Sequence, residues 1–164
     1  MPTELILDLA TLDVSRIVAD RESIRKVNPQ RFELEQLDAI VLVDPERKLI
    51  AGYKDVRSNE FWTRGHMPDN PLLPGVLMCE AAAQLCSYYV VTQHVLADDQ
   101  ILGFGGMDEV RFRSTVRPGE RLMLIARAER LKRVACVFEV QGFVGSTLAF
   151  EGKIFGMALP ARAV

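Results

Sequence analysis

Two polar side chains, His66 and Glu80, stand out against the apolar residues that surround them in this sequence. His66 lies in a segment that contains Pro68, Pro71 and Pro74, whereas Glu80 lies inside the long apolar run that follows. Histidine titrates near neutral pH and suits a general base, and a carboxyl that burial keeps protonated can act as a general acid. The pair therefore indicates acid–base chemistry. The alternative interpretations are a structural loop histidine and a glutamate at a solvated helix edge.

The elements predicted around these two residues are a rigid loop and a buried helix. Residues 57–74 contain too many prolines for a helix interior or a central strand, so we expect a loop that presents His66. Pro74 suits the first turn of a helix, because its missing N–H would have no partner there. The helix predicted over residues 74–96 is apolar on nearly every side and should be buried.

The start of this helix offers groups that could act on a substrate. The N–H groups of Gly75 and Val76 have no intrahelical partners and can polarise a carbonyl oxygen at the positive end of the helix dipole. Glu80 lies about one turn further, and Gln84 follows it on the same face as part of a narrow polar stripe. One helix thus provides both an oxygen-binding end and an acid.

Alternating apolar residues predict antiparallel strands on either side of the helix. Residues 37–43 and 49–56 form two of them, and residues 122–158 form about three or four more, whereas the Gly-Phe-Gly-Gly run at 103–106 predicts a mobile loop. A sheet with one apolar face needs a cover, and the long helix can supply it. The pattern predicts an α+β fold in one domain spanning residues 1–164, with residues 1–28 as a helical N-terminal extension.

The composition argues against several functional classes. The 20 basic and 22 acidic residues give a formal net charge of -2, so nucleic-acid binding is not expected. Three cysteines without a C-x-x-C pair, together with two histidines, do not predict a metal site and indicate buried free thiols in a reducing compartment. Polar residues interrupt the apolar run, and no basic region precedes the first apolar residues, so we expect neither a membrane span nor a secretory signal, and a cytoplasmic location.

The segment from Gly65 to Gln84 resembles the signature of the 3-hydroxyacyl-acyl carrier protein dehydratases. In that family the pattern runs G-H-F-P, two variable residues, P, two more, P-G-V-L, two more, and E-A-x-A-Q. The histidine, three prolines, both glycines, the glutamate and the glutamine fall in register. Weaker similarity covers about residues 31–159. Met67 replaces the usual phenylalanine, and Gln30 stands where the family's N-terminal pattern has a histidine.

The resemblance implies a hot-dog fold, in which an antiparallel sheet wraps around one central helix, and a reversible dehydration. His66 would remove a proton from C2 of a (3R)-3-hydroxyacyl thioester, and Glu80 would protonate the departing 3-hydroxyl, leaving water and a trans-2-enoyl thioester. The N–H of Gly75 would hold the thioester carbonyl, and no metal or organic cofactor is needed. The further substrate-binding residues that the resemblance implies are Val76, Met67, Gln84 and Phe104.

The resemblance also implies partners. Family members form homodimers in which the histidine of one subunit faces the glutamate of the other, and many assemble further as trimers of dimers. Acyl carrier protein is acidic, so its docking site should be basic, and Arg111, Arg113 and Arg117 are candidates, with ordinary solvated charges as the alternative. The expected pathway is fatty acid biosynthesis or a related acyl pathway. A specialised or non-catalytic acyl-thioester-binding paralogue and a hot-dog thioesterase are the alternative functions.

Overall fold

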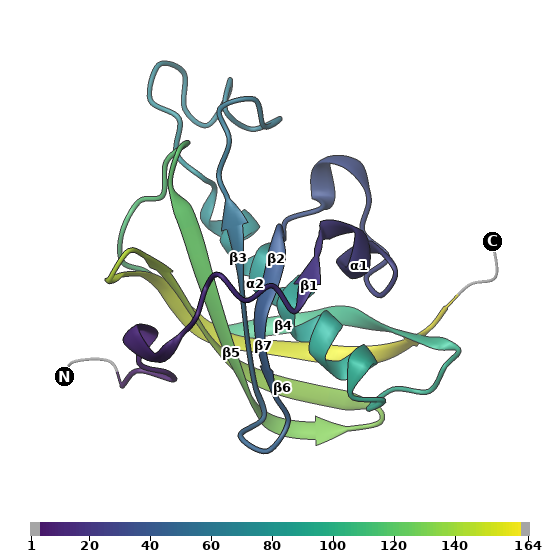
Figure 1. Ribbon diagram of the computed structural model, residues 1–164. Coiled ribbons are helices and arrows are strands. Elements are labelled where there is room, and N and C mark those ends of the chain that lie inside the picture. The colour runs from purple at the N-terminus through teal and green to yellow at the C-terminus, as the bar shows by residue number, and fades with distance from the viewer. Residues whose placement is uncertain (1–3, 162–164) are drawn as a thin grey trace.

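The computed structural model describes residues 4–161 and shows one long helix packed against a seven-stranded antiparallel sheet (Figure 1). The sheet curves around the helix, so the predicted α+β, hot-dog arrangement is confirmed. The strand order is β1-β2-β3-β5-β6-β7-β4, which makes β1 and β4 the two edges. The elements in chain order are η1 (Leu9–Thr11), β1 (Ala19–Asp20), α1 (Arg21–Arg25), η2 (Phe32–Leu34), β2 (Ala39–Asp44), β3 (Leu49–Asp55), α2 (Gly75–Thr92), β4 (Gln100–Phe112), β5 (Arg121–Lys132), β6 (Ala135–Val144) and β7 (Thr147–Pro160).

The central helix α2 is buried along most of its length, as its apolar pattern predicts. Leu85 and Val90 have no exposed surface, and the ring of Tyr89 meets Phe138 of β6 edge-on with centroids 5.8 Å apart. The helix ends at Thr92 rather than at the predicted residue 96, because the chain enters a left-handed conformation at His94 with φ of 53°. None of the helices within residues 4–161 has the length and apolarity needed to cross a membrane.

The mobile loop predicted at residues 103–106 is wrong, because these residues belong to the edge strand β4. Gly103 pairs with Met157 of β7 and Gly106 with Phe155, and the register shifts between Phe104 and Gly106. A side chain at Gly103 would collide with Leu159 across the strand pair. The glycines therefore allow a close approach of two strands at a bulge, where the sequence suggested flexibility.

The helical extension predicted over residues 1–28 is also wrong for most of its described length, since its only α-helix is the short α1. Ile6 and Leu7 instead pack against apolar side chains on the sheet face opposite α2, among them Tyr53 and Phe143. The buried Gln141 holds the segment in place, because its Oε1 accepts from the Ile6 N–H at 3.0 Å and its Nε2 donates to the Glu4 carbonyl at 2.8 Å. Residues 1–3 of the predicted extension, and residues 162–164 of the predicted domain, lie outside the described residues.

Candidate active site

His66 lies in the loop between β3 and α2, which projects beyond the end of the sheet (Figure 1). Its Nδ1 lies 2.8 Å from the carbonyl oxygen of Leu72, and the Leu72 N–H donates back to the His66 carbonyl at 2.8 Å. A carbonyl oxygen can only accept, so Nδ1 carries a proton, and the tautomer of the neutral ring that this bond selects has its lone pair on Nε2. The loop therefore fixes the tautomer that a general base requires.

The buried Trp62 and the partly buried Glu60 anchor this loop to the body of the protein. The carbonyl of Trp62 accepts the His66 N–H at 2.8 Å, and the Trp62 side chain is only 5% exposed. The Glu60 carboxylate accepts from Lys54 Nζ at 2.8 Å, from the Trp62 indole N–H at 3.0 Å and from the Arg57 backbone N–H at 2.9 Å. The position of His66 thus depends on Trp62, and that of Trp62 depends on Glu60.

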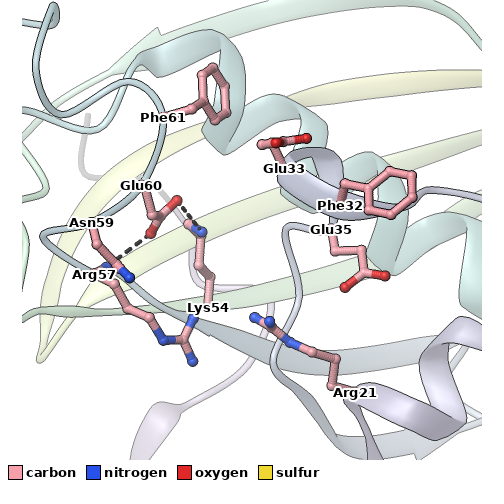
Figure 2. Close-up of a pocket in the computed structure, with 9 residues that line it drawn as sticks. All are labelled: Arg21, Phe32, Glu33, Glu35, Lys54, Arg57, Asn59, Glu60 and Phe61. Carbon is pink, nitrogen blue, oxygen red and sulfur yellow. Dashed lines mark hydrogen bonds and ion pairs between the residues drawn. The ribbon is translucent and has the colours of Figure 1, made fainter.

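Figure 2 shows the hollow that borders Glu60 and Lys54, with Phe32 and Phe61 among the residues that line it. Its volume is about 430 Å³. The cations that line it, Arg21, Lys54 and Arg57, already form ion pairs with carboxylates of the protein. Arg21 and Arg57 both reach Asp38 at 2.6 Å. Burial raises the pKa of the Asp38 carboxyl, yet hydrogen bonds from Arg57 and the Asp55 N–H, with the charge of Arg21, outweigh burial and hold this pKa below its ordinary value. The charged residues of this hollow therefore bind one another and stabilise the region next to the His66 loop.

Glu80 is half-buried on α2, and its carboxylate is oriented by Gln84 one turn later. Gln84 Nε2 donates to Glu80 Oε1 and to the Leu34 carbonyl, both at 2.7 Å, while Gln84 Oε1 accepts from the Gln36 N–H at 2.9 Å. Because backbone groups fix which end of the amide donates, Gln84 is locked toward the carboxylate. The Glu80 oxygen that accepts this N–H is the poorer place to bind a proton, so Oε2 is the oxygen better suited to exchange one.

Position 75 has no room for a side chain, because the ring of Phe112 from β4 lies directly against Gly75. A Cβ at this position would come within 2.6 Å of Phe112 Cζ. Phe112 in turn contacts Phe150 with ring centroids 6.3 Å apart. The first N–H groups of α2 thus lie beside an aromatic side chain that is 52% exposed, and Val76 next to Gly75 is 66% exposed. This end of the helix is accessible to a substrate oxygen.

A cavity of about 40 Å³ lies beside Glu80, between α2, β4 and β7. Of the predicted substrate-binding residues, only Phe104 lines it within 4–161, and Gly75, Val76, Met67 and Gln84 do not. The predicted base, His66, is not among its lining residues either. Gln30 lines the cavity and was not predicted as a site residue, although its departure from the family pattern was a signal. The full lining is Gln30, Glu80, Ala83, Ser87, Leu102, Gly103, Phe104, Ile154, Phe155 and Gly156.

The three arginines predicted to dock an acidic partner differ in their availability. Arg113 forms an ion pair with Glu151, which neutralises its charge. Arg117 Nη1 donates to Asn70 Oδ1 at 2.7 Å and so braces the His66 loop. Arg111 is exposed, and among residues 4–161 its side chain bonds a backbone carbonyl, that of Val110, at 2.8 Å and no carboxylate. Its charge is the most available of the three.

Other reactive groups lie away from this site or are held inert. Cys79, Cys86 and Cys136 are free and buried, as predicted. Burial raises the pKa of the Cys79 and Cys136 thiols to about 11, so neither is a thiolate near neutral pH. In the part of the chain that the structure describes, no cluster of three or more His, Cys, Asp or Glu side chains could hold a metal ion.

Comparison with known proteins shows the family of this chain, since residues 28–153 match the model of the FabA-like domain. The chain belongs to the FabA-like family. It is 36% identical over 138 residues to the 3-hydroxyacyl-[acyl-carrier-protein] dehydratase FabZ of Polynucleobacter asymbioticus, covering 84% of this chain and 91% of that protein. It is 32% identical over 136 residues to the FabZ of Clostridium kluyveri, covering 83% and 93%.

Solved structures share the fold at lower sequence identity. A chain of the dehydratase heterocomplex ApeI:P from Xenorhabdus doucetiae superposes with a TM-score of 0.68 at 15% identity, covering 83% of this chain and 90% of that one. A mutant thioesterase from Pseudomonas aeruginosa superposes with a TM-score of 0.61 at 18% identity, covering 88% and 97%. The same fold therefore occurs in a dehydratase complex and in a thioesterase, and it does not by itself identify a reaction.

Proposed function

We propose that this protein catalyses the reversible dehydration of (3R)-3-hydroxyacyl thioesters carried by acyl carrier protein, giving trans-2-enoyl thioesters in fatty acid biosynthesis or a related acyl pathway. The observation that carries the proposal is the pair of a histidine whose Nδ1 is engaged by a carbonyl, His66, and a carboxyl oriented by an amide, Glu80. The relatives named as 3-hydroxyacyl-[acyl-carrier-protein] dehydratases support it, since this chain matches them over most of its length.

The chemistry follows from these two groups. Nε2 of His66 takes the proton from C2 of the substrate, and the electron pair of that C–H bond forms the C2–C3 double bond. The C3–O bond breaks, and the proton on Glu80 Oε2 transfers to the departing oxygen to release water. The negative charge that develops on the thioester oxygen is stabilised by the N–H of Gly75 at the positive end of α2.

The active site needs two subunits in this proposal, with Glu80 of one subunit facing His66 of the partner subunit. The cavity beside Glu80 lacks a base of its own among residues 4–161. The edge strand β4 is 13 residues long and carries Phe104, Met107 and Phe112, each about half exposed. Long apolar edge strands are usually covered by a partner. We therefore propose a homodimer formed along β4, which can assemble further as a trimer of dimers, in the cytoplasm.

The acidic carrier protein would dock near Arg111, the arginine whose charge is most available. Arg111 lies on β4, the strand that also supplies Phe104 to the cavity and Phe112 to the helix start. Arg113 and Arg117 are engaged by Glu151 and Asn70, so they act as supports of this surface and contribute less to docking. A charge at Arg111 contributes mainly to the rate of association and is screened by salt.

A single assay separates the proposed activity from the alternatives. The protein is incubated with a crotonyl or 3-hydroxyacyl thioester while enoyl absorbance and free thiol are recorded together. Absorbance change without thiol supports the dehydratase, thiol release identifies the hot-dog thioesterase, and the absence of both identifies a binding module. His66→Ala and Glu80→Gln should each abolish the absorbance change, and dehydration by either variant at the wild-type rate would overturn the assignment.

A further inference from the structure

The cavity beside Glu80 is more polar than a tunnel for a plain alkyl chain requires. Glu80 and Ser87 lie on the same face of α2, two turns apart, and both line the cavity. The opposite wall is made by Phe104 of β4 and Phe155 of β7. Gln30, from the segment that precedes η2, contributes an amide to the same cavity. Polar groups thus lie beyond the acid, along the helix, among apolar side chains.

Neither the Gln30 nor the Ser87 side chain has a hydrogen-bond partner among the residues that the structure describes. The Oε1 atom of Gln30 is buried and unpaired. The residue lines both the Glu80 cavity and a smaller cavity next to Gln84, so the amide lies between the two. Ser87 is 4% exposed, and no acceptor or donor within 4–161 engages its hydroxyl. Buried polar groups are normally satisfied by protein, ligand or water.

We infer that Gln30 and Ser87 select an acyl chain that carries an oxygen substituent beyond C3, and this inference rests on the proposed dehydration at Glu80. When Glu80 reaches the 3-hydroxyl, the carbons beyond C3 enter the cavity that Glu80 lines. An amide and a hydroxyl both donate and accept, so together they match a hydroxyl or carbonyl group. An alkyl chain there leaves both groups unpaired, and sites with unpaired polar groups discriminate against such ligands.

The position of Gln30 in the sequence agrees with a role in specificity. It lies where the chain departs from the family's N-terminal pattern, which has a histidine at this point, whereas the residues from His66 to Gln84 stay in register. The reacting groups are thus retained while a wall of the acyl cavity differs. The cavity of about 40 Å³ has room for only a few water-sized groups, so a single substituent would occupy a large part of it.

The test compares matched thioesters that differ by one hydroxyl group. The probes are pantetheine thioesters of 3-hydroxyhexanoate and 3,5-dihydroxyhexanoate, and of 3-hydroxyoctanoate and 3,7-dihydroxyoctanoate. In at least one pair we expect kcat/KM for the dihydroxy compound to exceed that for the plain one by about tenfold. Gln30→Leu and Ser87→Ala should each reduce this ratio toward one, chiefly by lowering the rate with the dihydroxy compound. Gln93→Leu, a glutamine at the end of α2 that lines none of these cavities, is the matched control and should leave the ratio unchanged.

The outcomes separate this inference from the proposed function. If the wild-type protein dehydrates the plain compounds as fast as or faster than the dihydroxy compounds, the inference is wrong and the dehydratase stands. The same conclusion holds if a preference exists but survives both Gln30→Leu and Ser87→Ala, since the selecting groups would then lie elsewhere. If none of the four compounds is dehydrated, the proposed function itself fails. If a variant does not fold, the ratio of kcat/KM for the dihydroxy and plain compounds, measured with the wild-type protein, decides whether the inference holds.

Discussion

Replacing Glu60 with glutamine should destabilise the protein by about 3 kcal/mol, because it leaves a buried cation without its anion. Lys54 exposes only 2% of its side chain and Glu60 13%, and the two are joined at 2.8 Å. Removing one partner of such a pair costs about 3–5 kcal/mol. The Trp62 indole N–H and the Arg57 N–H also compete for the single remaining oxygen. Because Lys54 and Glu60 line the hollow of about 430 Å³, water can enter beside the unpaired cation in the variant, which keeps the expected cost near the lower bound.

Urea unfolding of the variant and of three comparison proteins measures this cost. Glu60→Gln should lower the midpoint with an unchanged slope. Lys54→Met/Glu60→Gln should recover more than half of the loss, because the unpaired charge is then gone. The control Glu46→Gln, at an exposed glutamate, should stay within about 0.5 kcal/mol of the wild type. A loss below about 1 kcal/mol for Glu60→Gln would refute the reasoning that the ion pair is buried and interdependent with its surroundings.

Three further predictions concern the start of α2, Gln84, and two buried thiols, one on α2 and one on β6. Gly75→Ala should lower kcat by at least about tenfold, because the added methyl group pushes the Phe112 ring away from the start of α2. Adding Phe112→Ala to the Gly75→Ala chain should restore part of the lost kcat. An unchanged kcat for Gly75→Ala would contradict the close packing of Gly75 against Phe112. Gln84→Leu should lower kcat much more than it changes KM, and destabilise the protein by about 1–3 kcal/mol through the unpaired Gln36 N–H; a change in KM alone would instead indicate direct substrate contact. Burial raises the pKa of the Cys79 and Cys136 thiols from 9.0 to about 11 in the folded protein. The unfolded chain therefore loses these protons first as the pH rises, so the contribution of the two thiols to stability is complete below pH 9 and is lost between pH 9 and 11. The loss is about 1.4 kcal/mol per pH unit for each thiol. The double Cys→Ala variant should show a shallower decline in urea unfolding over that range, and an equal decline would show that the thiols do not cause it.

The helix and the inner strands were predictable from sequence because each has a regular apolar pattern set by burial. The apolar run that follows Pro74 became α2, and the alternating residues after Arg121 became β5, β6 and β7. The proline-rich loop between β3 and α2 followed from backbone sterics alone. In these regions the local preference and the tertiary environment favour the same structure, which is why the prediction succeeded.

The regions that failed are those whose structure is set by a distant neighbour. The run Gly103 to Gly106 forms a strand because it pairs with β7, and side chains of β7 occupy the space above glycines of this run. No local sequence pattern reveals this pairing. The segment around Glu4 and Ile6 lies on the sheet because Gln141, far along the sequence, binds the backbone of these two residues. The role of Gln84 in orienting Glu80 required the loop of η2 to be placed next to α2. Sequence singled out His66 and Glu80 as candidates for the chemistry, but it did not reveal the groups that orient them.

The most direct test of the shared active site is complementation between two inactive variants. His66→Ala and Glu80→Gln chains are purified separately, mixed under conditions that exchange subunits, and assayed for dehydration of a 3-hydroxyacyl thioester. If His66 of one subunit works with Glu80 of the other, each mixed dimer regains one intact site, and random exchange restores about a quarter of the wild-type activity. If the mixture stays as inactive as the separate variants although mixed dimers have formed, the two residues do not act across the subunit interface and the proposed site is wrong.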